Sequence, residues 1–157
     1  MQMYEYHDDD LDDAIKYCTT LQLALKLDKS TEVLLMLVEI GGRQLVINKD
    51  RHGMTILHYA CQTKNPSLEI IVKFIEVGGW KLLMEKNRFG DTTLHNACEN
   101  ENISIEIISK MIEAGGRELL IEKDENGYTA LRIACENENV STDIISFALR
   151  LFFNEQP

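Results

Sequence analysis

Long apolar runs are missing from this chain of 157 residues, although 45% of its residues are hydrophobic. No stretch approaches the roughly 20 consecutive apolar residues that a helix needs to span a bilayer. The N-terminal segment MQMYEYHDDDLDD also lacks the basic start and the continuous apolar stretch of a signal peptide. We therefore expect an intracellular, cytoplasmic protein without a membrane-spanning segment.

Positive charge is also scarce, because the formal net charge is −10. Residues 1–10 begin an acidic N-terminal tail, and the segment MQMYEYHDDDLDD carries six acids and no base. A protein that binds a phosphate backbone needs a basic face, and none is visible, so nucleic-acid binding is not expected. The tail can bind a basic partner, but a solvated acidic end is the commoner explanation.

The cysteines show neither a disulfide framework nor a zinc pattern. Cys61, Cys98 and Cys135 occupy the same place, next to an alanine, in successive stretches of the chain. Stacked helices lie ~8–10 Å apart, whereas a disulfide needs Cα atoms closer than ~7 Å. No C-x-x-C motif or paired Cys/His spacing occurs. We predict that these three thiols are small, buried, hydrophobic residues.

Motifs for catalysis and cofactor binding are missing as well. The sequence has no serine or cysteine nucleophile motif, no phosphate-binding glycine loop and no paired metal ligands. Two ENEN segments carry Glu99, Glu101, Glu136 and Glu138 but lack the glycine turn of a calcium loop. A solvated rim explains these acids best, followed by a rim that faces a basic partner. We expect no cofactor, no metal site and no enzymatic activity.

The sequence does contain an internal repeat with a period of 37 residues. The best copy covers residues 85–121; one copy precedes it and another follows it. The positions that recur at this interval include Gly53, Gly90 and Gly127, His58 and His95, Ala60, Ala97 and Ala134, and the three cysteines. This regularity predicts stacked copies of one supersecondary unit.

We assign residues 11–157 to a single domain of about four repeats. One period before Met54 lies Tyr17, and the apolar residues that follow it fit the pattern without its turn residues, as expected of a capping unit. The boundaries are about 11–47 for the capping repeat and about 48–84, 85–121 and 122–157 for the three full repeats.

Each full repeat predicts a tight turn followed by two helices. The turn ends in a glycine that needs φ > 0, and the first helix begins after a threonine whose hydroxyl can cap it. These residues are Gly53, Gly90 and Gly127, and Thr55, Thr92 and Thr129. The second helix is apolar nearly all round, so it must be packed on several sides, and a glycine pair such as Gly78-Gly79 is expected to end it.

The succession of D/N-x-x-G, T-x-L-H-x-A-C and a second helix ending in glycine resembles the ankyrin repeat, whose first part reads D-x-x-G-x-T-P-L-H-x-A-A. The resemblance covers roughly residues 11–153 and implies an all-α, ankyrin-type helical repeat solenoid with short fingers that make little or no sheet. The period differs from the usual 33, and the extra residues are expected in loops. The family's helix-starting proline is replaced by Ile56, Thr93 and Ala130.

His58 and His95 stand at the family's Thr-x-x-His position, where they look like structural groups that bond back across the first helical turn. Arg132 takes the equivalent place in the last repeat. The structural residues implied by the resemblance are Gly53, Gly90, Gly127, Thr55, Thr92, His58 and His95.

The ankyrin family binds partners on a concave surface lined by the fingers and by the exposed side of the first helices. In this chain those positions vary between copies, whereas the core positions hardly change. The resemblance therefore implies non-catalytic recognition of a protein or peptide, with Phe89, Tyr128, Met54 and Arg88 as the best anchors. The expected partner-binding residues are Arg51, His52, Met54, Arg88, Phe89, Asp91, Glu99, Asn100, Asn126 and Tyr128.

The C-terminal end departs from the pattern. Phe152-Phe153 stands where a closing glycine pair is expected, and Phe147 replaces a lysine of the polar stripe of the second helix. Terminal repeats need a polar outer face. The end can therefore be an improvised cap, a junction to further repeats, or an apolar patch that self-associates. The alternative function is accordingly that of a structural or assembly segment of a larger ankyrin-repeat protein.

Overall fold

The computed structural model describes residues 19–138 and 142–154, and within these ranges it contains nine helices and no strand. The helices are α2 (Thr20–Lys26), α3 (Thr31–Ile47), α4 (Ile56–Gln62), α5 (Leu68–Gly78), α6 (Trp80–Met84), α7 (Thr93–Glu99), α8 (Ile105–Ile121), α9 (Ala130–Glu136) and α10 (Thr142–Asn154). The predicted all-α class and the helical-repeat architecture are confirmed. The capping segment before residue 19 and the connector over 139–141 lie outside the described residues.

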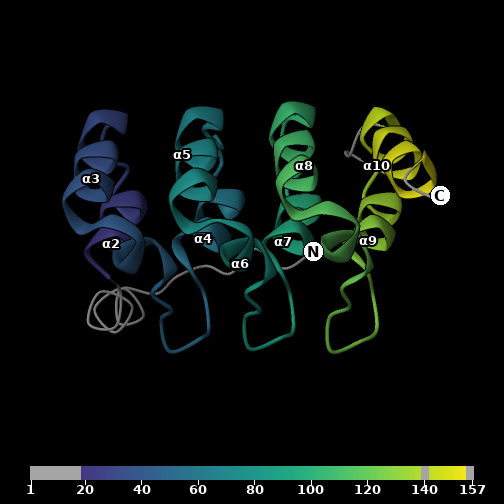
Figure 1. Cartoon of the computed structure of the whole chain (residues 1–157), viewed down its shortest axis with the longest axis horizontal. Helices are drawn as coiled ribbons and strands as arrows, with labels where there is room; N and C mark the ends of the chain where they lie inside the picture. The colour runs from purple at the N-terminus through teal and green to yellow at the C-terminus, as the bar shows by residue number, and fades with distance from the viewer. Residues whose placement is uncertain (1–18, 139–141, 155–157) are drawn as a thin grey trace.

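Helix pairs stand side by side in a single row (Figure 1). The second helices α3, α5, α8 and α10 form one layer, each in contact with the next, and the first helices α2, α4, α7 and α9 form the other. Three hairpin loops project from the same side of the row, one before each of α4, α7 and α9 (Figure 1). We call these loops the fingers of the second, third and fourth repeats.

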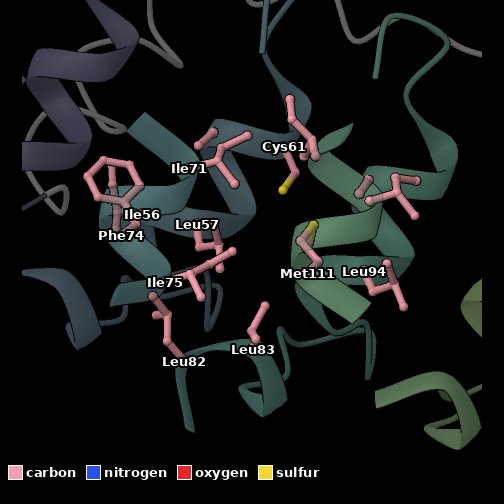
Figure 2. Close-up of a cluster of buried hydrophobic side chains, with 14 of the residues drawn as sticks. Ile56, Leu57, Cys61, Ile71, Phe74, Ile75, Leu82, Leu83, Leu94 and Met111 are labelled. Carbon is pink, nitrogen blue, oxygen red and sulfur yellow. The ribbon is translucent and has the colours of Figure 1, made fainter. Parts of the chain in front are cut away.

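The core runs continuously between the two layers. Figure 2 shows side chains of α4, α5 and α6 meeting those of α7 and α8, with Leu57, Phe74 and Met111 fully buried. Fully burying an apolar side chain of this kind contributes about 1.5–3 kcal/mol. The side chains of Ser67 and Ser104 accept hydrogen bonds from the amides of Ile70 and Ile107 and so fix where α5 and α8 begin.

The glycine pairs do not end the helical part of each repeat. Gly79, at φ 71°, separates α5 from the short helix α6, and α3 and α8 kink at Gly42 (φ 58°) and Gly116 (φ 66°) before a further helical segment. Leucines in these segments, such as Leu82 and Leu119, are fully buried. The glycine redirects the chain so that these leucines reach the core, and part of the long period is therefore helix, not loop.

The first helix of the first repeat is offset by one residue from the predicted register, whereas α3 keeps the 37-residue spacing, as Gly42 and Gly79 show. Thr19 caps α2 and Gln22 completes the cap, just as Thr55 and His58 do in α4. This interval is 36 residues, so Tyr17 is not the equivalent of Met54. The sequence pattern missed the offset because glutamine takes the place of the repeated histidine.

Candidate functional site

The fingers are tight turns organised by their first residue. In the second repeat, Asp50 Oδ1 accepts the amides of His52 and Met54 at 2.8 and 2.9 Å. Asn87 and Asp124 accept the equivalent pairs of amides in the next two fingers. The expected φ > 0 glycines close these turns, with φ of 73°, 78° and 80° at Gly53, Gly90 and Gly127.

Successive fingers are joined through their backbones. The amide of Arg88 donates to the carbonyl of His52 at 2.9 Å, and the amide of Glu125 donates to the carbonyl of Phe89 at 3.0 Å. A Cβ placed on Gly90 would lie 2.7 Å from the nitrogen of Glu125, so the fingers pack closely there. The three fingers therefore form one preformed row.

The two buried histidines connect each first helix to the next finger. His58 Nδ1 accepts the amide of Thr55 at 3.2 Å, and Nε2 lies 3.1 Å from the carbonyl oxygen of Asp91. A carbonyl only accepts, so Nε2 carries the proton and the ring is neutral. Burial lowers the pKa of His58 to about 4, in agreement with this assignment. His95 makes the same contacts with Thr92 and the carbonyl of Tyr128.

Further links between repeats come from amide side chains that the sequence analysis did not identify as structural. Gln22 Nε2 donates to the carbonyl of Met54 at 2.9 Å. Asn100 Nδ2 donates to the carbonyls of Cys61 and Thr63 at 2.7 and 2.9 Å, and Asn137 makes similar bonds one repeat later. The repeated asparagine of the ENEN segments was the signal for these bonds.

A cleft of about 510 Å³ lies between the fingers and the first helices. Seven of the ten predicted partner-binding residues line it: His52, Met54, Arg88, Phe89, Asp91, Glu99 and Asn126. The other lining residues are Tyr59, Gln62, Asn87, Asn96 and Asp124. The structure thus brings residues from three fingers and two first helices to one concave site.

Phe89 is the large apolar residue at this site that reaches solvent, with 51% of its surface exposed. The guanidinium of Arg88 lies 4.6 Å from the centre of its ring and 2.9 Å, through Nη1, from His52 Nδ1. Cation–π stacking and the hydrogen bond hold these side chains in place before any partner arrives.

A family model described as ankyrin repeats, in three copies, matches residues 63–150, more than half of the chain. The chain belongs to the ankyrin repeat family. Ankyrin repeats are in general protein–protein interaction modules and generally non-catalytic. A comparison with curated proteins gives no significant match.

Three predicted binding residues of this ankyrin array lie outside the cleft lining. Arg51 is exposed on its finger, and its Nε lies 3.1 Å from His52 Nε2. Tyr128 is half-buried, with the guanidinium of Arg132 at 3.8 Å from its ring centre. The side-chain amide of Asn100 is engaged in the repeat-to-repeat bonds described above. Within the cleft, Met54 and Asp91 are buried and do not stand at exposed finger tips.

The thiols of the ankyrin stack differ in burial. Cys61 and Cys98 are buried and free, and burial raises the pKa of both, that of Cys98 to about 12. Cys135 is exposed, so the prediction of burial is wrong for this residue. It belongs to α9, the first helix of the fourth repeat, and no described helix of a following repeat lies over it.

Two further kinds of site are missing from the part of the chain that the structure describes. No group of three or more His, Cys, Asp or Glu side chains is arranged to hold a metal ion in that part of the chain. No described helix is long and apolar enough to cross a membrane.

Proposed function

We propose that this chain is a non-catalytic ankyrin-repeat module that binds a protein or peptide on the concave face formed by its fingers and first helices. The cleft between these elements, with the exposed ring of Phe89 at its edge, is the observation that carries the proposal. Exposed aromatic and arginine side chains dominate the binding energy of protein interfaces.

Preorganisation supports the same proposal. The finger turns are fixed by side-chain bonds to their own backbone, and backbone bonds join each finger to the next. A surface that is already ordered loses little conformational entropy when a partner binds. This face is therefore the part of the described structure best prepared for recognition.

The buried histidines do not suit acid–base catalysis in this proposal. Both ring nitrogens of His58 are occupied by structural contacts and the ring is fully buried, so it has no proton to exchange with a substrate. The free, buried thiols of Cys61 and Cys98 suit a reducing compartment such as the cytoplasm, where we propose that the protein works.

Capture from cell lysate tests the binding face when two matched variants are compared with the unmodified chain. Phe89→Ala removes the ring at the cleft; Trp80→Ala removes a ring of equal exposure, 51%, on α6 and outside the cleft. The retained protein, once purified, is expected to bind Phe89→Ala at least about tenfold more weakly and Trp80→Ala with unchanged affinity. The reverse result, with both variants folded by circular dichroism, would contradict the proposed face.

A second candidate function is assembly by end-to-end stacking with a second copy of this chain. At the last repeat a cleft of about 310 Å³ is lined mainly by apolar residues, among them Ile121, Leu131, Leu149 and Phe153. At the other end Val33 is 39% exposed, although Ile70, one period later, is buried. The two ends thus expose positions that neighbouring repeats cover within the stack.

Sedimentation velocity over a range of concentrations tests this second candidate. We expect the unmodified chain to associate and the double variant Ile121→Lys, Phe153→Glu, which changes two exposed residues of the end cleft, to remain monomeric. A chain that stays monomeric at every concentration would rule out stacking between copies.

A further inference from the structure

One position on the first helices changes character between successive repeats. Tyr59, Asn96 and Ile133 are equivalent residues, one period apart. The hydroxyl of Tyr59 crosses to its own finger and donates to Asp50 Oδ2. The shorter side chain of Asn96 leaves the corresponding space open, and both Tyr59 and Asn96 line the resulting cleft.

Asn96 also leaves a hydrogen-bond acceptor unused. Its amide group hydrogen-bonds the carboxyl of Glu99, and only the NH₂ can donate in that bond. The remaining atom, Oδ1, is buried and has no hydrogen-bond partner, although the residue is only 2% exposed. A buried acceptor without a donor is unfavourable, and a donor supplied by a ligand in the cleft would remove that cost.

Negative charge predominates around this acceptor, since three acids and one base, Arg88, line the cleft. Asp91, Glu99 and Asp124 line the same cleft, and none of the ion pairs among the described residues involves them. Burial and the nearby charge of Asp124 raise the pKa of Asp91; desolvation and the charges of Asp91 and Asp124 raise that of Glu99. Each carboxylate is thus held near others of the same sign, and a cation between them would be stabilised.

The wall of the cleft suits a long side chain with a cationic end. The exposed ring of Phe89, on which Arg88 already stacks, provides apolar surface for an aliphatic stem, while carboxylates and the amide oxygen of Asn96 accept hydrogen bonds. A metal ion fits less well, because these acids are not arranged as a metal site. An anionic ligand would meet acceptors and negative charge.

We propose that the cleft between α7 and the fingers receives an arginine or lysine side chain that a partner protein inserts. This inference rests on the proposed function and specifies the chemistry of the partner at that face. Arginine and lysine share the cationic end and the aliphatic stem, and they differ in the number of donors that can reach the buried oxygen of Asn96.

Nuclear magnetic resonance titration with small probes tests the inference without an identified partner. The probes are N-acetyl-arginine amide, N-acetyl-lysine amide and the neutral analogue N-acetyl-citrulline amide. We expect saturable shifts at the side-chain amide of Asn96 and at the backbone amides of Asp91 and Glu99 for at least one cationic probe, and none for citrulline. The cationic probe with the lower dissociation constant identifies which residue, arginine or lysine, the partner inserts.

Three variants make the test specific. Glu99→Gln keeps the shape of the cleft and is expected to raise the dissociation constant about tenfold. Asn96→Tyr, which introduces the residue of the preceding repeat, is expected to abolish binding by filling the cleft. Glu113→Gln, an exposed acid on α8 outside the cleft lining, is expected to have no effect and serves as the control.

Two outcomes would overturn the inference: equal binding of citrulline and arginine amides, or an affinity for the cationic probes that Glu99→Gln leaves unchanged. Dependence of partner capture on Phe89 in either case would leave the proposed function standing while the basic-residue inference fails. If selective binding of the cationic probes and the dependence of partner capture on Phe89 were both absent, the face itself would be ruled out as a recognition surface.

Discussion

Buried polar residues in this molecule work as connectors, and their protonation state matters. His58 joins its own helix start to the next finger only as the neutral ring with its proton on Nε2. Gln22 makes the same two kinds of bond in the first repeat, since Oε1 accepts the amide of Thr19 at 2.9 Å and Nε2 reaches Met54. Glutamine and histidine are therefore structural equivalents here, except that only histidine titrates.

Acid is expected to destabilise the protein through His58. The folded pKa of about 4 lies below the ordinary 6.5, so the unfolded chain binds a proton between these values that the folded chain does not. The stabilising contribution is complete above about pH 6.5 and declines as the pH falls, by roughly 3 kcal/mol in total. Urea unfolding followed by circular dichroism at about pH 7 and about pH 4.5 measures it.

His58→Gln is the matched variant for this prediction, because Gln22 already fills the equivalent place. We expect it to stay close to the unmodified chain in stability near neutral pH and to lose this part of the acid sensitivity. Lys49, Asp50 and Glu85 act on the ring and remain in both proteins, so their titration cancels in the comparison. An identical pH dependence in the two proteins would show that His58 is not responsible.

At the scale of elements, the loops that join the helices make hydrogen bonds that helical periodicity in the sequence does not predict. Asn100→Ala removes the amide that donates to the carbonyls of Cys61 and Thr63. The loss is expected to cost about 1–3 kcal/mol in the free energy of unfolding. Asn102→Ala, two residues away and exposed, should cost less than about 0.5 kcal/mol. Equal values for the two variants in urea unfolding would deny Asn100 this role.

The packing of one finger on the next is tested by a pair of glycine variants. Gly90 and Gly127 have nearly the same φ, 78° and 80°, so alanine suffers similar backbone strain at both. A Cβ at Gly90 would lie 2.7 Å from Glu125 N, whereas nothing lies within 4 Å of one at Gly127. Thermal unfolding is expected to show a larger drop in Tm for Gly90→Ala. A larger drop for Gly127→Ala would contradict close finger packing.

These elements also show which features a sequence pattern can predict. The spacing of Leu57, Ala60 and Cys61 indicated a buried helix face because apolar periodicity reflects packing directly. The glycine pairs were interpreted as helix ends, but a glycine with φ > 0 can equally redirect the chain into another helix, as Gly79 does before α6. Local geometry alone does not distinguish the two.

The candidate site was predictable in part for the same reason. Finger positions such as His52 and Phe89 could be assigned because they vary within a fixed pattern, and they line the cleft. Asn96 was missed because its importance depends on a contact across space. The space beside Asn96 becomes apparent only by comparison with the preceding repeat, where the longer side chain of Tyr59 reaches Asp50. Such a relation between a helix and a finger leaves no signature in residue spacing.

At the scale of the whole molecule, a stack differs from a globular domain because its two ends cannot resemble its middle. Each inner first helix is in contact with the next, α4 with α7 and α7 with α9, and buries its cysteine. The cysteine of α9 is exposed. Burial at one repeated position thus reports whether a neighbour is stacked on that repeat.

Thiol labelling of a Cys18→Ser variant turns this difference into a measurement. Cys135 is expected to react with Ellman's reagent in the native protein, and Cys61 and Cys98 only after unfolding, because both are buried and their raised pKa suppresses the thiolate. If copies stack end to end, labelling of Cys135 should slow as protein concentration rises, and Ile121→Lys should restore the fast rate. A rate independent of concentration would mean that the last repeat remains uncovered in solution, and the proposed concave cleft would then be the remaining candidate surface for a partner.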